Sequence, residues 1–299
     1  MNHLPLLIRR EFWEHRSFFI APAVVAAILI LIITFGHPQF RHASLDLVGN
    51  PEFESKRYAI LTLLLTGVAV PYLISMGFLT LFYLLDSLYA DRKDRSVLFW
   101  KSLPVSDRET VISKLVVAAV ALPLMTFGAV LATNLLFGLI GSLRLSGTVE
   151  HVWSMVWEPR LWFAAHALIL YSMATMTLWY LPILGWLLLV SAWARRAVIL
   201  WAVLPILALM LLEYGFLQTF HVAHMLRDRF GGWFHLALNT NAAERAADVD
   251  GSRIPMTGRL IDSIDPGTFF SSPGLWIGLI VAAGFIWAAI LLRRRRSET

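Results

Sequence analysis

Long apolar runs separated by short charged segments dominate the hydropathy pattern of this chain. A helix needs about 20 consecutive apolar residues to cross the ~30 Å hydrocarbon core of a bilayer, and six runs reach that length. Three of them, within residues 58–85, 115–143 and 161–194, contain no Asp, Glu, Lys or Arg. We therefore predict an all-α polytopic membrane protein whose single transmembrane domain covers residues 1–299. The predicted spans lie at about 18–36, 59–85, 111–140, 161–190, 197–218 and 274–292.

Residues 1–16 precede the first span and have an amphipathic pattern. Leu4, Ile8 and Phe12 share one helical face, and Arg10 can pair with Glu14 one turn later. This pattern predicts a helix that lies in the membrane interface. A cleaved signal peptide is the competing interpretation, but the apolar run is too long and no small-residue cleavage site follows it.

The longest predicted extramembrane segment is the loop 219–273 between the fifth and sixth spans. Its first part, from Phe220 to Leu238, is apolar and aromatic around Gly231 and Gly232. We expect a pair of short helices that dip into the outer interface, followed by an exposed polar loop over residues 239–265.

The positions of the basic residues predict the orientation. One set of termini and short loops carries fifteen Lys and Arg residues, whereas the two short loops on the other side carry five. Because short cytoplasmic loops are enriched in Lys and Arg, we expect both termini and residues 86–110 in the cytoplasm. The run Arg293 to Arg296 abuts a span and is interpreted as a stop-transfer anchor rather than a nucleic-acid patch.

Composition narrows the class further. The chain is 58% hydrophobic and only 15% charged, with a mean hydropathy of +0.67, whereas soluble domains carry about 25% charged residues. It has no cysteine, so disulfides and thiolate metal sites are excluded. Its formal net charge of +5 is explained by the loops that flank the spans.

The densest internal charge cluster lies between the second and third spans. Five charged residues, 91–95, are followed after Ser96 by the apolar residues 97–100, and the segment contains no glycine before Pro104. Residues 85–104 are predicted to form a short amphipathic helix at the membrane face. Directly afterwards, Ser106 and Glu109 fit a capping box that begins the third helix.

Few residues offer catalytic or metal-binding chemistry. The chain has no phosphate-binding loop of the G-x-x-x-x-G-K-[ST] type and no H-E-x-x-H zinc motif. His221, His224 and His235 form the one histidine cluster, which we interpret as interfacial because no carboxylate has suitable spacing. Glu213 is the one carboxylate inside a span, and it is either a functional intramembrane group or an outer headgroup or hydrogen-bonding residue. No catalytic residue, metal ligand or cofactor site is predicted in this chain.

The second span has a polar stripe at helical spacing, with Ala69 and Met76 between its hydroxyl residues. This face is expected to point towards protein or a cavity, although Thr hydroxyls can also bond back to their own helix. With the fifth span near Glu213, it is the predicted substrate pathway, comprising Thr62, Thr66, Met76, Thr80, Tyr83 and Glu213. In the last span, Gly274, Gly278 and Ala282 form a small-residue face suited to close helix packing.

The segment 88–107, which reads LYADRKDRSVLFWKSLPVSD, resembles that of a permease subunit of the bacterial type-2 ABC exporters. The similarity extends over the whole chain and includes the start RREFWEHR at residues 9–16, six spans and a large outer loop before the last span. This resemblance implies a permease that dimerises with a second copy or a homologous permease and recruits two separate ATPase subunits, which would carry ATP and Mg. It also implies that the loop after the second span is the coupling helix.

The residues expected to contact the ATPase are Asp91, Arg92, Asp94, Arg95, Leu98, Phe99 and Trp100. The chain would then be a multi-pass protein of the bacterial inner membrane that forms the substrate passage of an ATP-driven exporter and is not itself an enzyme. Two alternatives stay open: a membrane assembly or sensor subunit that transports nothing, and an ion-coupled carrier whose coupling group would be Glu213. The similarity implies no particular substrate.

Overall fold

A computed structural model describes residues 3–35, 61–93, 106–146, 152–239 and 260–295 of the 299-residue chain. These residues are helical except for short connections and one isolated bridge between Leu238 and Ile264. Six of their helices are long and apolar enough to cross a membrane. The all-helical, six-span prediction is therefore confirmed at this level.

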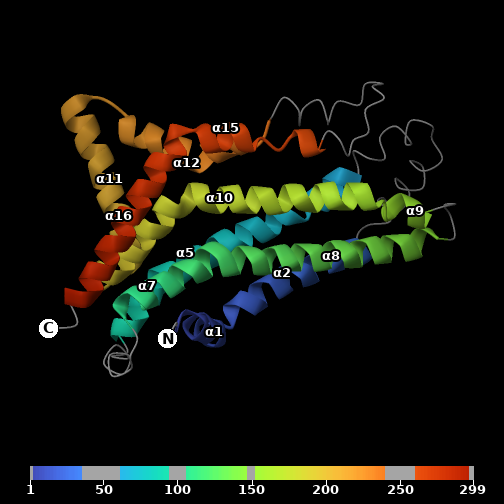
Figure 1. Cartoon of the computed structure of the whole chain (residues 1–299), viewed down its shortest axis with the longest axis horizontal. Coiled ribbons are helices and arrows are strands. Elements are labelled where there is room, and N and C mark those ends of the chain that lie inside the picture. The colour runs from blue at the N-terminus through green and yellow to red at the C-terminus, as the bar shows by residue number, and fades with distance from the viewer. Residues whose placement is uncertain (1–2, 36–60, 94–105, 147–151, 240–259, 296–299) are drawn as a thin grey trace.

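The helices are labelled in Figure 1. The first half contains α1 (Leu4–Glu14), α2 (Ser17–Phe35), α5 (Ala69–Lys93), α7 (Asp107–Val116), the π-helical turn η1 (Val117–Ala121) and α8 (Leu122–Leu145). The second half contains α9 (Val152–Val156), α10 (Pro159–Trp193), α11 (Val198–Leu217), α12 (His221–Ala237), α15 (Pro266–Ser271) and α16 (Pro273–Arg295). The second candidate span begins at Leu61, ahead of α5, and the third combines α7, η1 and α8.

The candidate spans fall into two length classes. Those that contain α5, α8 and α10 have 33, 38 and 35 residues, whereas those at α2, α11 and α16 have 19, 20 and 23. At 1.5 Å per residue, the long helices measure roughly 50 Å, which exceeds the ~30 Å of bilayer hydrocarbon. The long helices must therefore tilt in the membrane or project beyond it.

Helix α10 lies at the centre of the bundle and packs most extensively against α16 and α5. A Cβ atom at Gly185 of α10 would lie 3.2 Å from the backbone oxygen of Ala282, so the two helices approach closely at these small residues. This confirms close packing at Ala282 of the small-residue face in the last span. Helix α10 continues without a break through Pro182 and Gly185.

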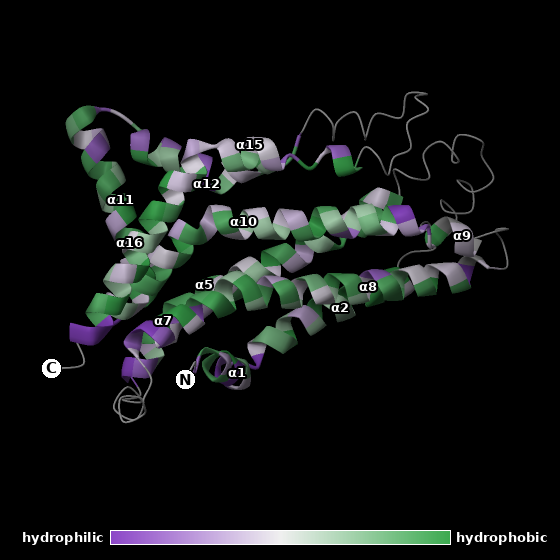
Figure 2. Cartoon of the chain, viewed as in Figure 1, coloured by the Kyte–Doolittle hydropathy of each residue, from purple (hydrophilic) through white to green (hydrophobic). Residues whose placement is uncertain are grey.

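Both chain termini, the end of α5 and the beginning of α7 lie at one end of the bundle (Figure 1). Figure 2 shows that hydrophilic residues gather at this same end, at the start of α7 and the end of α16. We call it the basal end. The start of α1 and the end of α16 therefore lie at the same end of the bundle as residues 86–93 and 106–110.

Two local predictions are confirmed and two are wrong. Arg10 Nε donates to Glu14 Oε1 at 2.6 Å, and Ser106 and Glu109 form the reciprocal capping box. The predicted start of a separate helix at residue 85 is wrong, because residues up to Lys93 continue α5 with no Gly or Pro to stop it, and the rest of the segment 85–104 lies outside the described residues. The apolar region after Phe220 forms one helix, α12, instead of two.

Helix α12 runs through Gly231 and Gly232 because α10 supports it at that point. The indole Nε1 of Trp179 donates to the carbonyl of Arg229 at 2.7 Å, and the hydroxyl of Tyr180 donates to the carbonyl of Phe230 at 2.6 Å. Tertiary contacts of this kind outweigh the weak helix propensity of glycine.

Candidate functional site

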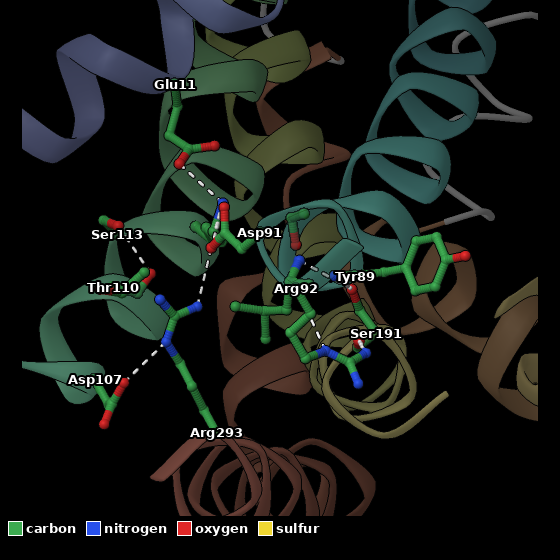
Figure 3. Close-up of polar contacts among 12 residues, drawn as sticks. Glu11, Tyr89, Asp91, Arg92, Asp107, Thr110, Ser113, Ser191 and Arg293 are labelled. Carbon is green, nitrogen blue, oxygen red and sulfur yellow. Dashed lines mark hydrogen bonds and ion pairs between the residues drawn. The ribbon is translucent and has the colours of Figure 1, made fainter. Parts of the chain in front are cut away.

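The basal end contains a network of buried charged side chains from four helices (Figure 3). Its first pair joins α1 to α7: Lys114 Nζ lies 3.0 Å from Glu11 Oε1, and each side chain is only 2% exposed. The hydroxyl of Tyr83 on α5 donates to the other oxygen of the same carboxylate at 2.9 Å. Glu11 is thus held by cationic and neutral donors from two other helices.

The second part of the network joins α5, α7 and α16. The guanidinium of Arg293 donates through Nη1 to Asp91 Oδ2 at 2.9 Å and through Nε to Asp107 Oδ1 at 3.0 Å. Lys114 Nζ and Arg10 Nη2 each lie 3.8 Å from Asp91. Asp91 therefore connects the two parts into one continuous network.

The burial of this network determines its energetic effect. Charges taken out of water carry a large desolvation cost, which opposite partners offset only while every partner is present. Glu11, Asp91 and Asp107 here face the three cations Arg10, Lys114 and Arg293. Removing Glu11, Lys114, Asp91 or Arg293, which are all less than 10% exposed, would leave a buried charge poorly compensated, so the network favours one relative arrangement of α1, α5, α7 and α16.

His15 borders this network at the end of α1. Its Nε2 lies 3.7 Å from Glu11 Oε2, and its ring meets the edges of Phe18 and Tyr83 at centroid distances of 5.3 and 5.0 Å. Burial lowers the pKa of His15 below its usual 6.5, although the Glu11 carboxylate partly opposes that shift. His15 is consequently neutral at neutral pH.

A separate set of contacts joins α5 to the end of α10. The guanidinium of Arg92 donates to the backbone oxygens of Ser191 and Ala194, with Nη2 at 2.8 Å from the latter. The hydroxyl oxygen of Ser191 accepts from the backbone N–H groups of Leu88 and Tyr89 at 3.0 and 3.1 Å. Arg92 thereby caps the carbonyls at the C-terminal end of α10, where cationic donors are favourable.

Asp91 and Arg92 are the two predicted ATPase-contact residues that the structure describes. Asp91 is buried in the network, and Arg92 caps α10, so both side chains make contacts within the chain. The other predicted contact residues lie outside the described residues: Asp94, Arg95, Leu98, Phe99 and Trp100. Because α5 ends at Lys93 and α7 is capped by Ser106, these residues connect two helices that the network holds together.

The predicted pathway face of the second span lies inside the single chain. Met76, Thr80 and Tyr83 are 5–8% exposed, whereas Leu63 and Ile74, on the opposite side of the helix, are 71% and 58% exposed. The hydroxyl of Thr66 donates to the backbone carbonyl of Thr62, 2.7 Å away and one turn earlier in the same helix. This is the bond back to its own helix that the sequence left open for Thr residues. The inward direction of the stripe is confirmed at Met76, Thr80 and Tyr83, whose side chains are buried within the chain.

The hydrogen bonds of Glu213 are made with the start of α12 and its preceding turn, rather than with the pathway face of the second span. Its carboxylate accepts hydrogen bonds from the backbone N–H groups of His221 and Val222 and from the hydroxyl of Thr219. It thus caps the first turn of α12 from the end of α11, a favourable position for a carboxylate. Its polar contacts within the described residues favour the hydrogen-bonding interpretation over the intramembrane one.

The histidine cluster shows no metal-binding geometry. His221 is 83% exposed, with Nδ1 3.0 Å from Glu213. Among the described residues, no group of three or more His, Cys, Asp or Glu side chains could hold a metal ion.

Sequence reasoning missed most of the charged network. The sequence pattern places Lys114 among the basic residues of the loops, Arg293 in the stop-transfer run and Glu11 in an interfacial helix. Glu11 follows Leu7 by one turn, and both are buried, so the apolar side of α1 includes a face that the pattern of Leu4, Ile8 and Phe12 did not single out. No local signal links Glu11 to Lys114, because they lie 103 residues apart.

Comparison with known proteins adds no relative: no family model, no curated protein and no solved structure matches the chain.

Proposed function

We propose that this chain is the membrane-spanning subunit of an ATP-driven exporter, which forms the substrate passage as a dimer and is driven by a separate ATPase subunit. The proposal includes an inner-membrane location with both termini cytoplasmic. ATP and Mg would bind the partner, because the chain has no phosphate-binding loop of its own. The resemblance of residues 88–107 to exporter permeases is one line of support.

The observation that carries the proposal is the charged network at the base of the 94–105 connection. Asp91 lies near the end of α5, and Asp107 and Lys114 lie at the start of α7, so the two helices flanking the connection share one network. Arg293 and Glu11 extend it to α16 and α1. A force applied to the connection would therefore reach four helices together.

A network that joins four helices suits a membrane subunit whose conformational change is driven by a separate partner subunit. Transport requires an element with two arrangements whose equilibrium an energy source biases. A rigid basal cluster transmits motion of the connecting segment to α5 and, through Arg92, to the end of α10. The predicted pathway face on the same second-span helix would move with it, and the path would open only when the partner acts.

Purification of the intact chain from its native membrane tests the proposal. We expect a stoichiometric subunit that carries a G-x-x-x-x-G-K-[ST] motif and hydrolyses ATP. Replacing Phe99 and Trp100 together with Ala should remove that subunit from the complex while membrane insertion is unchanged. As a matched control, Trp276→Ala alters an exposed tryptophan at the start of α16 and should leave recruitment intact.

Two outcomes would overturn it. Recruitment of the ATPase that is unchanged by the Phe99 and Trp100 replacements would remove the assigned contact. A purified, folded complex that contains no ATPase would favour an assembly or sensor subunit.

The buried ionisable cluster supports a second candidate, an ion-coupled carrier. Intramembrane ionisable groups often form proton relays, and Glu11, Asp91 and Lys114 lie close together near the basal end. In this carrier, flux in sealed vesicles would follow an imposed proton gradient and would not need ATP. The exporter proposal predicts the reverse dependence.

A further inference from the structure

A cavity of about 990 Å³ lies beside the network, along a face of α5 that shares only Tyr83 with the predicted pathway. Its α5 lining consists mainly of residues at helical spacing: Ser75, Phe78, Leu79, Phe82, Asp86 and Tyr89. Residues at the start of α2 and in the first turn of α11 form its other walls. Cavities of 300–1,000 Å³ are typical of sites for drug-sized ligands.

The cavity is polar at one end and mainly apolar along its length. His15, Asp86 and Tyr89 lie towards the basal end of the bundle, where α1 and α5 end. Asp86 and Ser75 are eleven residues apart, which corresponds to roughly 16 Å along the helix. Between them the wall presents two phenylalanines, two leucines and Tyr83, so the cavity suits a ligand with an apolar body and a polar end.

Charge distinguishes among such ligands. Among the described residues that line the cavity, Asp86 is the one with a formal charge at neutral pH, because His15 is neutral. The arginines nearest in sequence to the lining, Arg16, Arg195 and Arg196, are exposed and do not line it. Aromatic rings from α5 and Phe18 surround the space, and such rings attract cations through their π faces.

We propose that this cavity binds an amphipathic organic cation, with its positive charge near Asp86 and its apolar body between α2, α5 and α11. Taken as the cargo class of the exporter, this inference rests on the proposed function. Binding itself needs no ATPase, so its test is independent of partner recruitment.

Tetraphenylphosphonium and tetraphenylborate provide the test, because the two ions share size and shape but have opposite charge. Their binding is measured with ion-selective electrodes on the full chain in nanodiscs of neutral phosphatidylcholine, with empty nanodiscs as background. We expect saturable binding of the phosphonium, at one ion per chain, and at least fivefold weaker binding of the borate.

Three variants make the measurement specific. Asp86→Asn should weaken phosphonium binding about fivefold, since a partly exposed ion pair contributes on this scale, and should reduce the preference over the borate. Leu79→Trp should reduce binding of both ions by filling the apolar part. Asp228→Asn removes a carboxylate that is 70% exposed on α12 and should change neither ion's affinity.

Every other result overturns the proposal. Equal saturable binding of the two ions, even if Leu79→Trp abolished it, would show that the cavity takes an apolar group such as a lipid chain. Phosphonium binding that Asp86→Asn leaves unchanged would remove the role of the carboxylate. Nanodiscs that bind neither ion above background would show that the cavity binds no such ligand, while leaving ATPase recruitment to be judged separately.

Discussion

Asp91 and Arg293 are 202 residues apart in the chain, yet Oδ2 of one lies 2.9 Å from Nη1 of the other. Their contact joins the end of the second span to the end of the last. Both side chains are less than 10% exposed, so neither charge can be hydrated if its partner is lost. Replacing one residue of this pair therefore tests how much the basal network contributes to stability.

Arg293→Met should destabilise the folded chain by about 3 kcal/mol, because it leaves Asp91 and Asp107 without their shared cation. The measurement is reversible unfolding in mixed micelles with increasing SDS. Arg295→Met, at an exposed neighbour on the same helix, should leave the transition midpoint unchanged. Equal effects of the two replacements would show that the network contributes only net charge.

The buried pair Glu11 and Lys114 should show strong energetic coupling. Glu11→Gln and Lys114→Met should each be destabilising, whereas the double variant should be less destabilised than the sum of the two. An interaction free energy of about 2 kcal/mol is expected for a contact of this burial. A double-mutant cycle on unfolding free energies measures it, and simple additivity would contradict a direct pair.

His15 should make stability depend on pH. Its pKa in the folded chain is lowered below 6.5 by burial, so the unfolded state binds more protons between these two values. This contribution is complete above about pH 6.5 and is lost as the pH falls towards the folded-state pKa. His15→Gln should reduce the slope of unfolding free energy against pH in this window, and an unchanged slope would contradict the assignment.

Gly278→Ala should loosen the packing of α12 on α16. A Cβ atom at Gly278 would overlap the guanidinium of Arg229, whose carbon lies 2.6 Å from the Cβ position. That guanidinium lies 4.4 Å from the ring centroid of Trp179 and donates to the carbonyl of Gly274. We expect a loss of about 1 kcal/mol and altered tryptophan fluorescence.

The control for this replacement lies six residues along the same helix. A Cβ atom at Gly284 would have no neighbour within 4 Å, so Gly284→Ala should be neutral or slightly stabilising because alanine favours the helix. If the two alanine variants have the same unfolding free energy, the Arg229 guanidinium does not pack against Gly278.

Cysteine labelling tests the predicted route without background, since the chain has no native cysteine. In the assembled complex, Thr62→Cys, Thr66→Cys, Met76→Cys and Thr80→Cys should react with a water-soluble thiol reagent. Leu63→Cys and Ile74→Cys should not, because their exposed faces would meet lipid or another subunit.

The burial of Met76 and Thr80 in this conformation adds a second expectation. Their labelling should increase when ATP is supplied to the complex. Labelling of only the two positions on the opposite face would mean that the passage lies on the other side of the helix.

The sequence alone was enough to locate the six spans, the capping box at Ser106 and the pair between Arg10 and Glu14. These features depend on hydropathy and on spacings of three or four residues along one helix, which can be read from neighbours in the chain. The same local reasoning found the inward face of the second span, because burial follows helical period.

Tertiary structure decided which distant helices meet. The contacts of Glu11 with Lys114, of Asp91 with Arg293 and of Arg229 with Gly278 join residues more than 45 positions apart. A hydropathy pattern places these charged residues in loops or at the membrane interface, because it contains no information about which distant residue a buried charge contacts. Packing of α1, α5 and α16 against α7 supplies the partners within the basal network, and the desolvation cost of leaving any of them unpaired makes that arrangement specific.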